Sequence, residues 1–363
     1  MSADEILIWA MAAFAALGAV DRILGNKLGL GEKFEEGIQA MDSLALAMVG
    51  IIAIAPVLAN VLKPVVVPVF GFLGADPAMF AGTILACDMG AGPLAKALTE
   101  DAQAAALGGV LCGSMLGATI VFSIPVALGI LQEADRPFLA KGILAGIVTI
   151  PVGLLAGGLV AGIPVLKILR NLVPIVLIGA VIALGLWKWE KAMIKGFGIF
   201  GKGVICLITV GLAAVIVQSL TGFVLIPGLA PIEEAFQTVG TIAIVLSGAF
   251  PLVFVLTKVL KKPLMKLGSL LGINDTAAAG LIASLANSIA TFGMVKDMDK
   301  RGKVVNIAFA VSAAFVFGDH LGFAAGFAPE MLPAMIVGKL AGGISAVVLA
   351  LILTKEKKPD PNR

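Results

Sequence analysis

The chain has 363 residues, of which 60% are hydrophobic and 13% are charged, whereas soluble domains average roughly 45–50% and about 25%. The mean hydropathy is +1.08 and the net charge is +3. Apolar runs long enough to form membrane-spanning helices recur from one end of the chain to the other. This composition excludes a soluble enzyme, a disordered chain and a nucleic-acid-binding protein. It predicts an all-α, polytopic membrane protein.

The first residues, Met1 to Glu5, are acidic. A cleaved signal peptide begins with a basic region, so we expect the first span to be retained. The three cysteines, Cys87, Cys112 and Cys206, all lie in apolar segments. Because their number is odd and none belongs to a C-x-x-C pair, the sequence predicts neither a disulfide framework nor a metal site. We expect no cofactor.

Eleven apolar segments follow one another along the chain. Nine are long enough to cross a hydrocarbon core of ~30 Å as helices. The third and the ninth are shorter, rich in small residues and interrupted by polar groups. The segments run approximately over residues 5–24, 42–62, 78–94, 104–131, 138–161, 165–187, 197–220, 235–257, 277–294, 304–327 and 331–353.

The positions of Lys and Arg test whether segments 78–94 and 277–294 cross the membrane. If all eleven segments cross, 14 basic residues lie in inside loops and 11 in outside loops, which is no bias. If the two short segments are re-entrant hairpins, the counts become 21 inside and 4 outside. The positive-inside rule therefore favours nine transmembrane helices and two re-entrant hairpins. In this topology the N-terminus is outside, and Lys262, Lys300 and the C-terminus face the cytoplasm.

The two short segments also anchor an internal repeat with a period close to 198 residues. The motif at residues 61–64 is echoed at 259–263, and the motif at 74–76 is echoed at 272–274. With re-entrant hairpins the first unit begins outside and the second inside, so the repeat is inverted, as in many secondary transporters. The predicted units are a first repeat (1–164), a linker helix (165–196), a second, inverted repeat (197–354) and a charged cytoplasmic tail (355–363).

Ionisable residues lie at membrane depth in this arrangement. Asp88 falls in the break of the first hairpin, and Asp319 lies within segment 304–327 beside His320, the only histidine. A carboxylate at bilayer depth costs roughly 2.5–3.5 kcal/mol and usually handles an ion, a proton or a substrate. Two structural alternatives stay open: Asp319 as the partner of Lys339, and Asp88 as the cap of a half-helix. His320 is either a proton relay or a hydrogen-bond donor beside Asp319.

Neutral polar side chains occupy the matching break of the second hairpin. Asn287 and Ser288 lie in this break, and Asn306 lies at the start of the segment that carries Asp319. Amides and hydroxyls in such positions receive polar groups of a substrate or bridge neighbouring helices. Both interpretations stay open for these three residues, which we add to the candidate binding site.

Several other classes of protein can be tested on the sequence. The single histidine excludes a zinc protease of the H-E-x-x-H type, and the lack of a P-loop excludes direct use of ATP. An intramembrane aspartyl protease would resemble a Gly-x-Gly-Asp pattern, but the residues before Asp319 are Val316-Phe317-Gly318. A purely structural anchor has no need of carboxylates at the midplane. The residues alone therefore favour a secondary transporter of a small polar solute, cationic or neutral.

Characteristic stretches cover nearly the whole chain in order: 34–37, 44–50, Leu85-Ala86-Cys87-Asp88-Met89-Gly90, 120–129, 311–315, Gly318-Asp319-His320-Leu321-Gly322-Phe323-Ala324-Ala325 and 336–340. With these stretches the chain closely resembles one family, the EutH family of ethanolamine-utilisation membrane proteins. The departures from the family are modest: the connection at residues 161–165 is short, and the chain contains no tyrosine.

The resemblance implies a multi-pass ethanolamine permease of the bacterial inner membrane. Its partners would be ethanolamine and the lipid bilayer, without nucleic acid, and a homo-oligomer is left open. We expect alternating access, with the substrate ammonium held by Asp88 or Asp319 and its hydroxyl received by groups such as Asn287 and Ser288. The alternatives are a carrier of another small polar solute and, more remotely, the intramembrane aspartyl protease.

Overall fold

The structure is a computed structural model that describes residues 2–355, apart from the side chains at 260, 261, 264, 267 and 269. Residues 356–363, most of the predicted charged tail, lie outside the described residues. Every regular element within the described range is helical. Eight helices of this range are long and apolar enough to cross a membrane, and each overlaps a predicted span. The prediction of an all-α polytopic membrane protein is confirmed.

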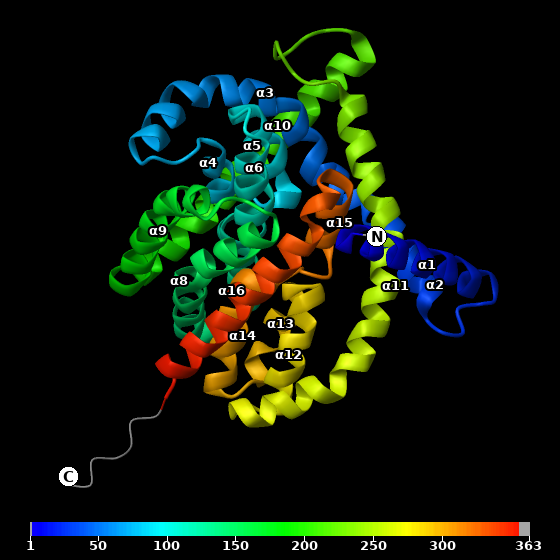
Figure 1. The fold of residues 1–363 in the computed structure, drawn as a ribbon, viewed down its shortest axis with the longest axis vertical. Helices are drawn as coiled ribbons and strands as arrows, with labels where there is room; N and C mark the ends of the chain where they lie inside the picture. Colours follow the sequence, from blue (N-terminus) through cyan, green and yellow to red (C-terminus); the bar gives the residue numbers. More distant parts are fainter. Residues whose placement is uncertain (1, 356–363) are drawn as a thin grey trace.

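Long helices alternate with short ones along the chain (Figure 1). Residues 106–117 and 119–123 continue α6 as a wider, π-helical segment that runs into α7. In chain order the helices are α1 (Ala3–Ile23), α2 (Leu30–Gln39), α3 (Met41–Phe72), α4 (Ala78–Ile84), α5 (Ala91–Leu98), α6 (Ala102–Ala105), α7 (Ile124–Ile130), α8 (Arg136–Val160), α9 (Val165–Lys188), α10 (Glu190–Thr221), α11 (Ile232–Leu271), α12 (Asp275–Ala286), α13 (Ser288–Met294), α14 (Lys300–Ala313), α15 (Asp319–Phe327) and α16 (Leu332–Leu353).

Both short apolar segments form helical hairpins whose ends meet. The first hairpin is α4 and α5, and the Thr99 hydroxyl after it donates to the Asp76 carboxylate before it (3.0 Å). The second is α12 and α13, where the backbone N–H of Asn274 donates to the Asp299 carboxylate (2.9 Å) and its side-chain amide donates to the Asp297 carbonyl (3.0 Å). Each hairpin therefore returns the chain to the place where the hairpin begins.

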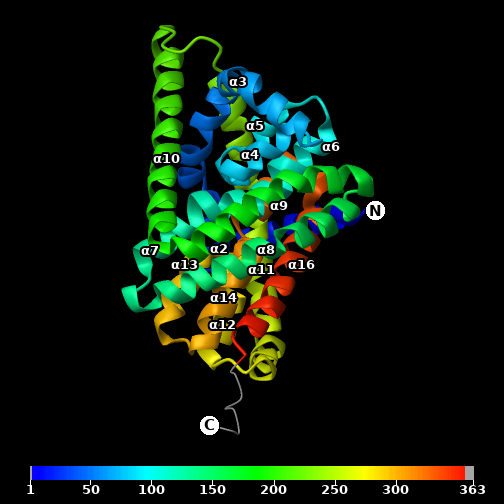
Figure 2. The ribbon, with the colours of Figure 1, turned by 90° about the vertical axis from the view of Figure 1, so that its left-hand side faces the viewer.

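The two hairpins lie in different halves of the molecule. In Figures 1 and 2, α4 and α5 lie in the upper half, and α12 and α13 lie in the lower half. The long helices that lead to the hairpins run in opposite senses, because α3 ends near the top of Figure 1 and α11 ends near the bottom. The breaks of both hairpins are directed toward the centre, where α15 begins.

The predicted span 304–327 is not one continuous helix. α14 ends at Ala313, and α15 begins only at Asp319. Phe315, between them, has φ = +61°, a left-handed conformation that bulky side chains avoid. The segment is apolar on both sides of the break, so its hydropathy did not predict an interruption. The number of nine crossing helices stays a prediction.

Close helix packing holds the two halves of the chain together. α8, from the first half, packs along α14 and α16, from the second half. Gly157 of α8 has no room for a side chain, because an added Cβ would lie 2.8 Å from the Ala334 carbonyl oxygen of α16. A Cβ atom added to Gly153 would likewise lie 2.7 Å from the Gly338 carbonyl oxygen. Small residues let membrane helices approach this closely.

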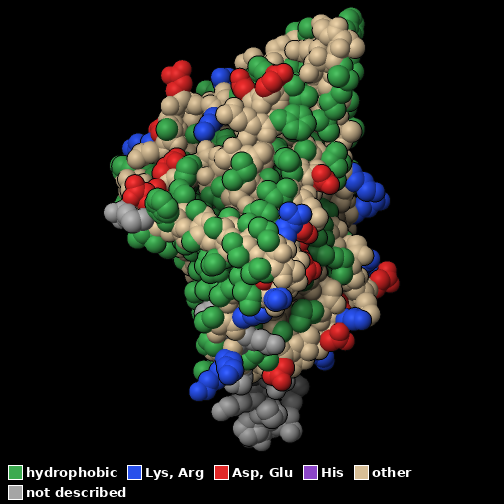
Figure 3. Space-filling model, turned by 90° about the vertical axis from the view of Figure 1, so that its right-hand side faces the viewer, with side chains coloured by type: hydrophobic (Ala, Val, Ile, Leu, Met, Phe, Trp, Pro, Cys, Tyr) green, Lys and Arg blue, Asp and Glu red, His purple; other side chains and the backbone are tan. Residues whose placement is uncertain are grey.

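The outer surface is largely apolar. Figure 3 shows hydrophobic side chains across much of one face, with charged side chains in separate groups. Phe72 is 91% exposed and Leu220 is 80% exposed, and many further large apolar side chains on α9 and α10 also face outward. An apolar exterior of this extent is expected of a protein whose surroundings are lipid.

Candidate functional site

Backbone hydrogen bonds hold the interruption before α15 beside the last residues of α12, next to the break of the second hairpin. The N–H groups of Phe315 and Phe317 donate to the carbonyls of Ser284 and Leu285 at 3.0 and 2.9 Å. Gly318 then passes so close to the Ala286 carbonyl that a Cβ atom would overlap it. A glycine is required at this position for steric reasons. The pairing places the first residue of α15 next to the break of the second hairpin.

Asp319 and Asn287 line one cavity of about 300 Å³. Asn287 separates α12 from α13, and its side-chain oxygen accepts the N–H of Ile289 (2.7 Å) as a helix cap. Asp319 is partly buried at the N-terminus of α15, where the helix dipole favours a negative charge. The remaining lining residues come from α2, α11 and the segment around the break: Lys33, Glu36, Phe250, Val253, Phe254, Thr257, Ala286, Phe317 and Gly318.

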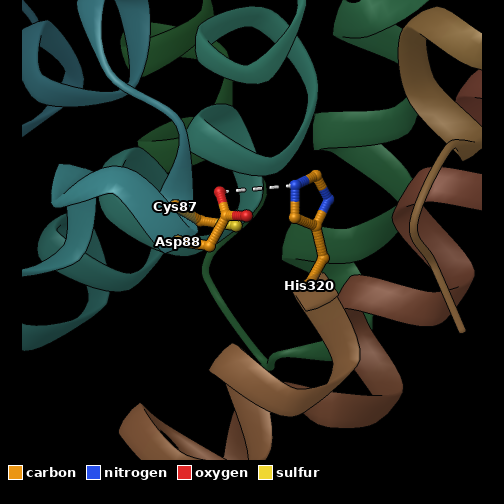
Figure 4. A group of neighbouring side chains, drawn as sticks. All are labelled: Cys87, Asp88 and His320. Atoms are coloured by element: carbon orange, nitrogen blue, oxygen red, sulfur yellow. Dashed lines mark ion pairs between the residues drawn. The ribbon is translucent and has the colours of Figure 1, made fainter. Parts of the chain in front are cut away.

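The second residue of α15 contacts the first hairpin. Figure 4 shows the Asp88 carboxylate directed at the imidazole ring of His320. The distance from His320 Nε2 to the nearer carboxylate oxygen is 3.6 Å, which is too long for a direct hydrogen bond. Cys87, on the same short turn, brings its sulfur close to both side chains. His320 is buried, whereas the Asp88 side chain is 20% exposed.

Lys339 of α16 is fully buried, but its hydrogen-bond partner is not Asp319. Its ammonium donates to the Ser114 carbonyl at 2.5 Å, within the π-helical segment of residues 106–117. The pair with Asp319 that was the structural alternative is not among the ion pairs of the described residues. Lys339 nevertheless interacts electrostatically with Asp88, and Asp88 in turn interacts with Asp319.

The remaining predicted site residues, Ser288 and Asn306, lie at different places. Ser288 begins α13, is completely buried, and its hydroxyl has no hydrogen-bond partner among the described residues. Asn306 donates to the carbonyls of Ala277 and Gly302, both at 2.9 Å, and so fastens α14 to the first half of the second hairpin. Asn306 does not line the cavity that contains Asp319.

Sequence reasoning missed three residues that lie at or beside the site. Lys33 and Glu36 form an ion pair (2.5 Å) that lines the cavity; Glu36 lies within the stretch 34–37 that carries the family resemblance, and Lys33 directly precedes it. Cys87 lies in an apolar segment, and its sequence context assigned it no role in the site. The sequence predicted no metal site, but the structure brings potential ligand atoms of Cys87, Asp88 and His320 within 4.8 Å of one another.

A family model described as "Ethanolamine utilisation protein, EutH" matches residues 3–353. The "Probable ethanolamine permease EutH" of Listeria monocytogenes is 61% identical, and the alignment covers 90% of this chain and 87% of that protein. The protein of the same name from Salmonella typhimurium is 51% identical over 90% of this chain and 89% of its own length. YxeR of Bacillus subtilis, described as an uncharacterized protein, is also 51% identical, and the alignment covers 90% of this chain and 88% of that protein. No solved structure matches the chain.

Proposed function

Because the chain belongs to the EutH family of ethanolamine utilisation proteins, we propose that it is an ethanolamine permease. It is a multi-pass membrane transport protein and not an enzyme, and relatives that cover most of its length are named permeases. Its location is the bacterial inner membrane, where it imports ethanolamine for catabolism. The intramembrane aspartyl protease considered from the sequence is thereby set aside.

One observation carries the assignment of the substrate site: the start of α15 contacts the breaks of both hairpins. Asp319 shares a cavity with Asn287, and the next residue, His320, faces Asp88. Polar groups from two hairpins and one broken helix therefore converge at the centre of an otherwise apolar protein. Non-helical backbone at membrane depth is tolerated where it is buried in protein or lines a cavity. Secondary transporters use such broken elements to bind their substrates.

The charges at this centre suit a single small cation. Asp88 interacts electrostatically with Asp319 and with Lys339. Counted with both carboxylates and the Lys339 ammonium ionised and with His320 neutral, the centre has a formal net charge of −1, which one ethanolamine ammonium group neutralises. Burying an unbalanced charge is costly, so this balance favours a monovalent cation over an anion.

The polar groups can be divided between the two ends of the substrate. The ammonium is held by Asp319 or Asp88. The hydroxyl is received by the Asn287 amide, which lines the cavity. The unpartnered Ser288 hydroxyl lies next along the chain, behind the cavity lining, and becomes a second acceptor when the hairpin moves. His320 positions Asp88 or relays a proton. Asn306 acts from outside the cavity, by fixing α12 against α14.

The hairpins also supply a physical basis for alternating access. We assign α4–α5 and α12–α13 as re-entrant hairpins of an inverted repeat, with units at residues 1–164 and 197–354 joined by the linker 165–196. The hydrogen-bonded base of each hairpin and the opposite senses of α3 and α11 (Figure 1) support this assignment. Tilting one unit against the other then exposes the central site to one side of the membrane at a time.

A competition panel tests the substrate assignment. Uptake of labelled ethanolamine into proteoliposomes is measured with unlabelled propylamine, which lacks the hydroxyl, and propanol, which lacks the ammonium. We expect propylamine to compete weakly and propanol not at all. Full competition by a nucleoside or a dicarboxylate would instead support a carrier of another polar solute on the same fold, and would contradict the assignment to ethanolamine.

A further inference from the structure

The cluster of Cys87, Asp88 and His320 contains more potential ligand groups than an ammonium site requires. A carboxylate is sufficient to hold an ammonium, yet a thiol and an imidazole lie beside it. Cys87 is completely buried and His320 is 2% exposed. The potential ligand atoms of the three residues all lie within 4.8 Å of one another, and they come from two separate parts of the chain, the first hairpin and α15 (Figure 4).

The spacing of these atoms matches a shared metal ion. Zinc binds sulfur at about 2.3 Å and nitrogen or oxygen at about 2.0–2.2 Å, so two ligands of one tetrahedral ion lie roughly 3.3–3.8 Å apart. The distance of 3.6 Å between His320 Nε2 and the Asp88 carboxylate falls within this range. It is too long for a hydrogen bond. The sulfur of Cys87 lies within 4.8 Å of both ligand atoms.

The local charges also balance a divalent ion. When Cys87 binds zinc it does so as a thiolate, and its proton passes to solvent. The thiolate, Asp88 and Asp319 then carry three negative charges and Lys339 carries one positive charge. The resulting net charge of −2 is neutralised by one divalent cation. Asp88 belongs both to this cluster and to the proposed ammonium site, so metal and substrate compete for it.

We propose that Cys87, Asp88 and His320 form an inhibitory site for Zn²⁺ or a similar thiolate-binding divalent metal. Three protein ligands leave a fourth position for water. Bound metal occupies Asp88 and links the first hairpin to α15, so it blocks substrate and holds together two elements that transport must move. His320 Nδ1 has no hydrogen-bond partner among the described residues. Because metal-binding histidines are usually oriented by such a partner, we expect reversible binding and not a permanent structural zinc.

The metal site itself can be tested without any transport assay. The purified full-length protein is titrated with Co²⁺, whose bond to a thiolate gives a strong near-ultraviolet absorption band, and Zn²⁺ is then added to displace it. We expect one Co²⁺ per chain and a thiolate band that Zn²⁺ removes. The band should be lost in Cys87→Ser, and His320→Gln should weaken binding by at least about tenfold.

The chain provides matched controls. Cys112 is also buried, but its thiol is directed at the Gly82 carbonyl, and Cys206 is exposed on α10. Cys112→Ser and Cys206→Ser should keep the band. A wild-type protein without a thiolate band, or a band that survives in Cys87→Ser, would overturn the proposal. Thermal unfolding of each variant identifies a failure to fold. If Cys87→Ser is unstable, retention of the band in both Cys112→Ser and Cys206→Ser assigns it to Cys87, the remaining one of three cysteines, and loss of the band in either variant would overturn the proposal.

The inhibitory role rests on the proposed transport function and has a separate measurement. Ethanolamine uptake is measured with increasing Zn²⁺ and again after a chelator is added. We expect reversible inhibition in the wild type and in Cys206→Ser, and a requirement for at least about tenfold more Zn²⁺ in Cys87→Ser. A Co²⁺ thiolate band without zinc inhibition would overturn the inhibitory role alone. Absence of ethanolamine uptake in the wild type would instead contradict the proposed function, whereas the spectrum would still decide the metal site.

Discussion

The substitution Lys339→Gln tests whether the buried charges act on the transported molecule. Lys339 is completely buried and donates to the Ser114 carbonyl at 2.5 Å. A glutamine amide can also donate to this carbonyl, so the substitution removes the charge and retains a donor. In our account the net charge of the empty site then changes from −1 to −2. The site should become more favourable for a molecule with two positive charges.

Ethylenediamine is the matched probe, because it replaces the hydroxyl of ethanolamine with a second ammonium group when it is doubly protonated. The repulsion between Lys339 and this second charge sets the size of the effect. At a separation of about 8 Å and an effective dielectric constant of about 20, the repulsion is about 2 kcal/mol. Its removal corresponds to roughly a 30-fold change in relative affinity.

The assay compares competition by ethylenediamine and by unlabelled ethanolamine against labelled ethanolamine below neutral pH. We expect the ratio of the two inhibition constants to shift about 30-fold toward ethylenediamine in Lys339→Gln. Lys63→Gln, at an exposed position on α3, removes the same charge elsewhere and should leave the ratio unchanged. An unchanged ratio in a folded Lys339→Gln protein would refute the reasoning that Lys339 and the substrate share one site.

Three further predictions concern packing, charge and topology. Gly157→Leu should overfill the contact between α8 and the Ala334 carbonyl and destabilise the protein by about 1–3 kcal/mol, which would lower the midpoint of thermal unfolding in detergent. The control Gly196→Leu, in open space on α10, should have little effect on this midpoint. Burial opposes ionisation of Asp101, but the Lys167 ammonium at 2.6 Å and the backbone N–H groups lower the pKa of Asp101 below 3.8. The ion pair should therefore stabilise the folded protein, by at most about 1 kcal/mol for so exposed a pair, at pH values above the pKa of an unfolded aspartate, and this stabilisation should be lost as the pH falls through the lower pKa of the folded state. The unfolding free energies of wild type and Asp101→Asn should then converge in acid. Single cysteines placed at Lys262 and Lys300 in a cysteine-free background should both react only with reagents applied from the cytoplasmic side, and labelling of the two from opposite sides would contradict the re-entrant second hairpin.

Hydropathy and charge predicted the parts of the fold that one chain segment decides by itself. Long apolar runs fix helices such as α8 and α10, and the polar interruption at Asp88 falls between the end of α4 and the start of α5. The break at residues 314–318 was not predicted because it is stabilised by the carbonyls of Ser284 and Leu285, which are distant in sequence. The local sequence pattern cannot indicate a hydrogen-bond partner that lies so far away in the chain.

The candidate site shows the same division between local and distant information. The rarity of charge at membrane depth identified Asp88, Asp319 and His320. Their partners depend on how the helices assemble. Lys339, which was one alternative partner for Asp319, donates to the Ser114 carbonyl instead, and the cavity beside Asp319 receives an ion pair from α2. The sequence therefore nominated some of the polar groups but not Lys33, Glu36 or Cys87, and helix packing decides which of them meet.

The central claim is that α15 begins at the substrate site, and uptake by Asp319→Asn tests it most directly. Labelled ethanolamine is supplied to proteoliposomes at about pH 6, where its amine is protonated, with wild type, Asp319→Asn and the exposed control Asp42→Asn compared at equal protein content. We predict saturable uptake by the wild type and by Asp42→Asn. In a folded Asp319→Asn protein the half-saturation concentration should rise at least about tenfold, the loss expected for a charge-assisted hydrogen bond of about 1.5–3 kcal/mol. Unaltered saturable uptake by Asp319→Asn would contradict the account.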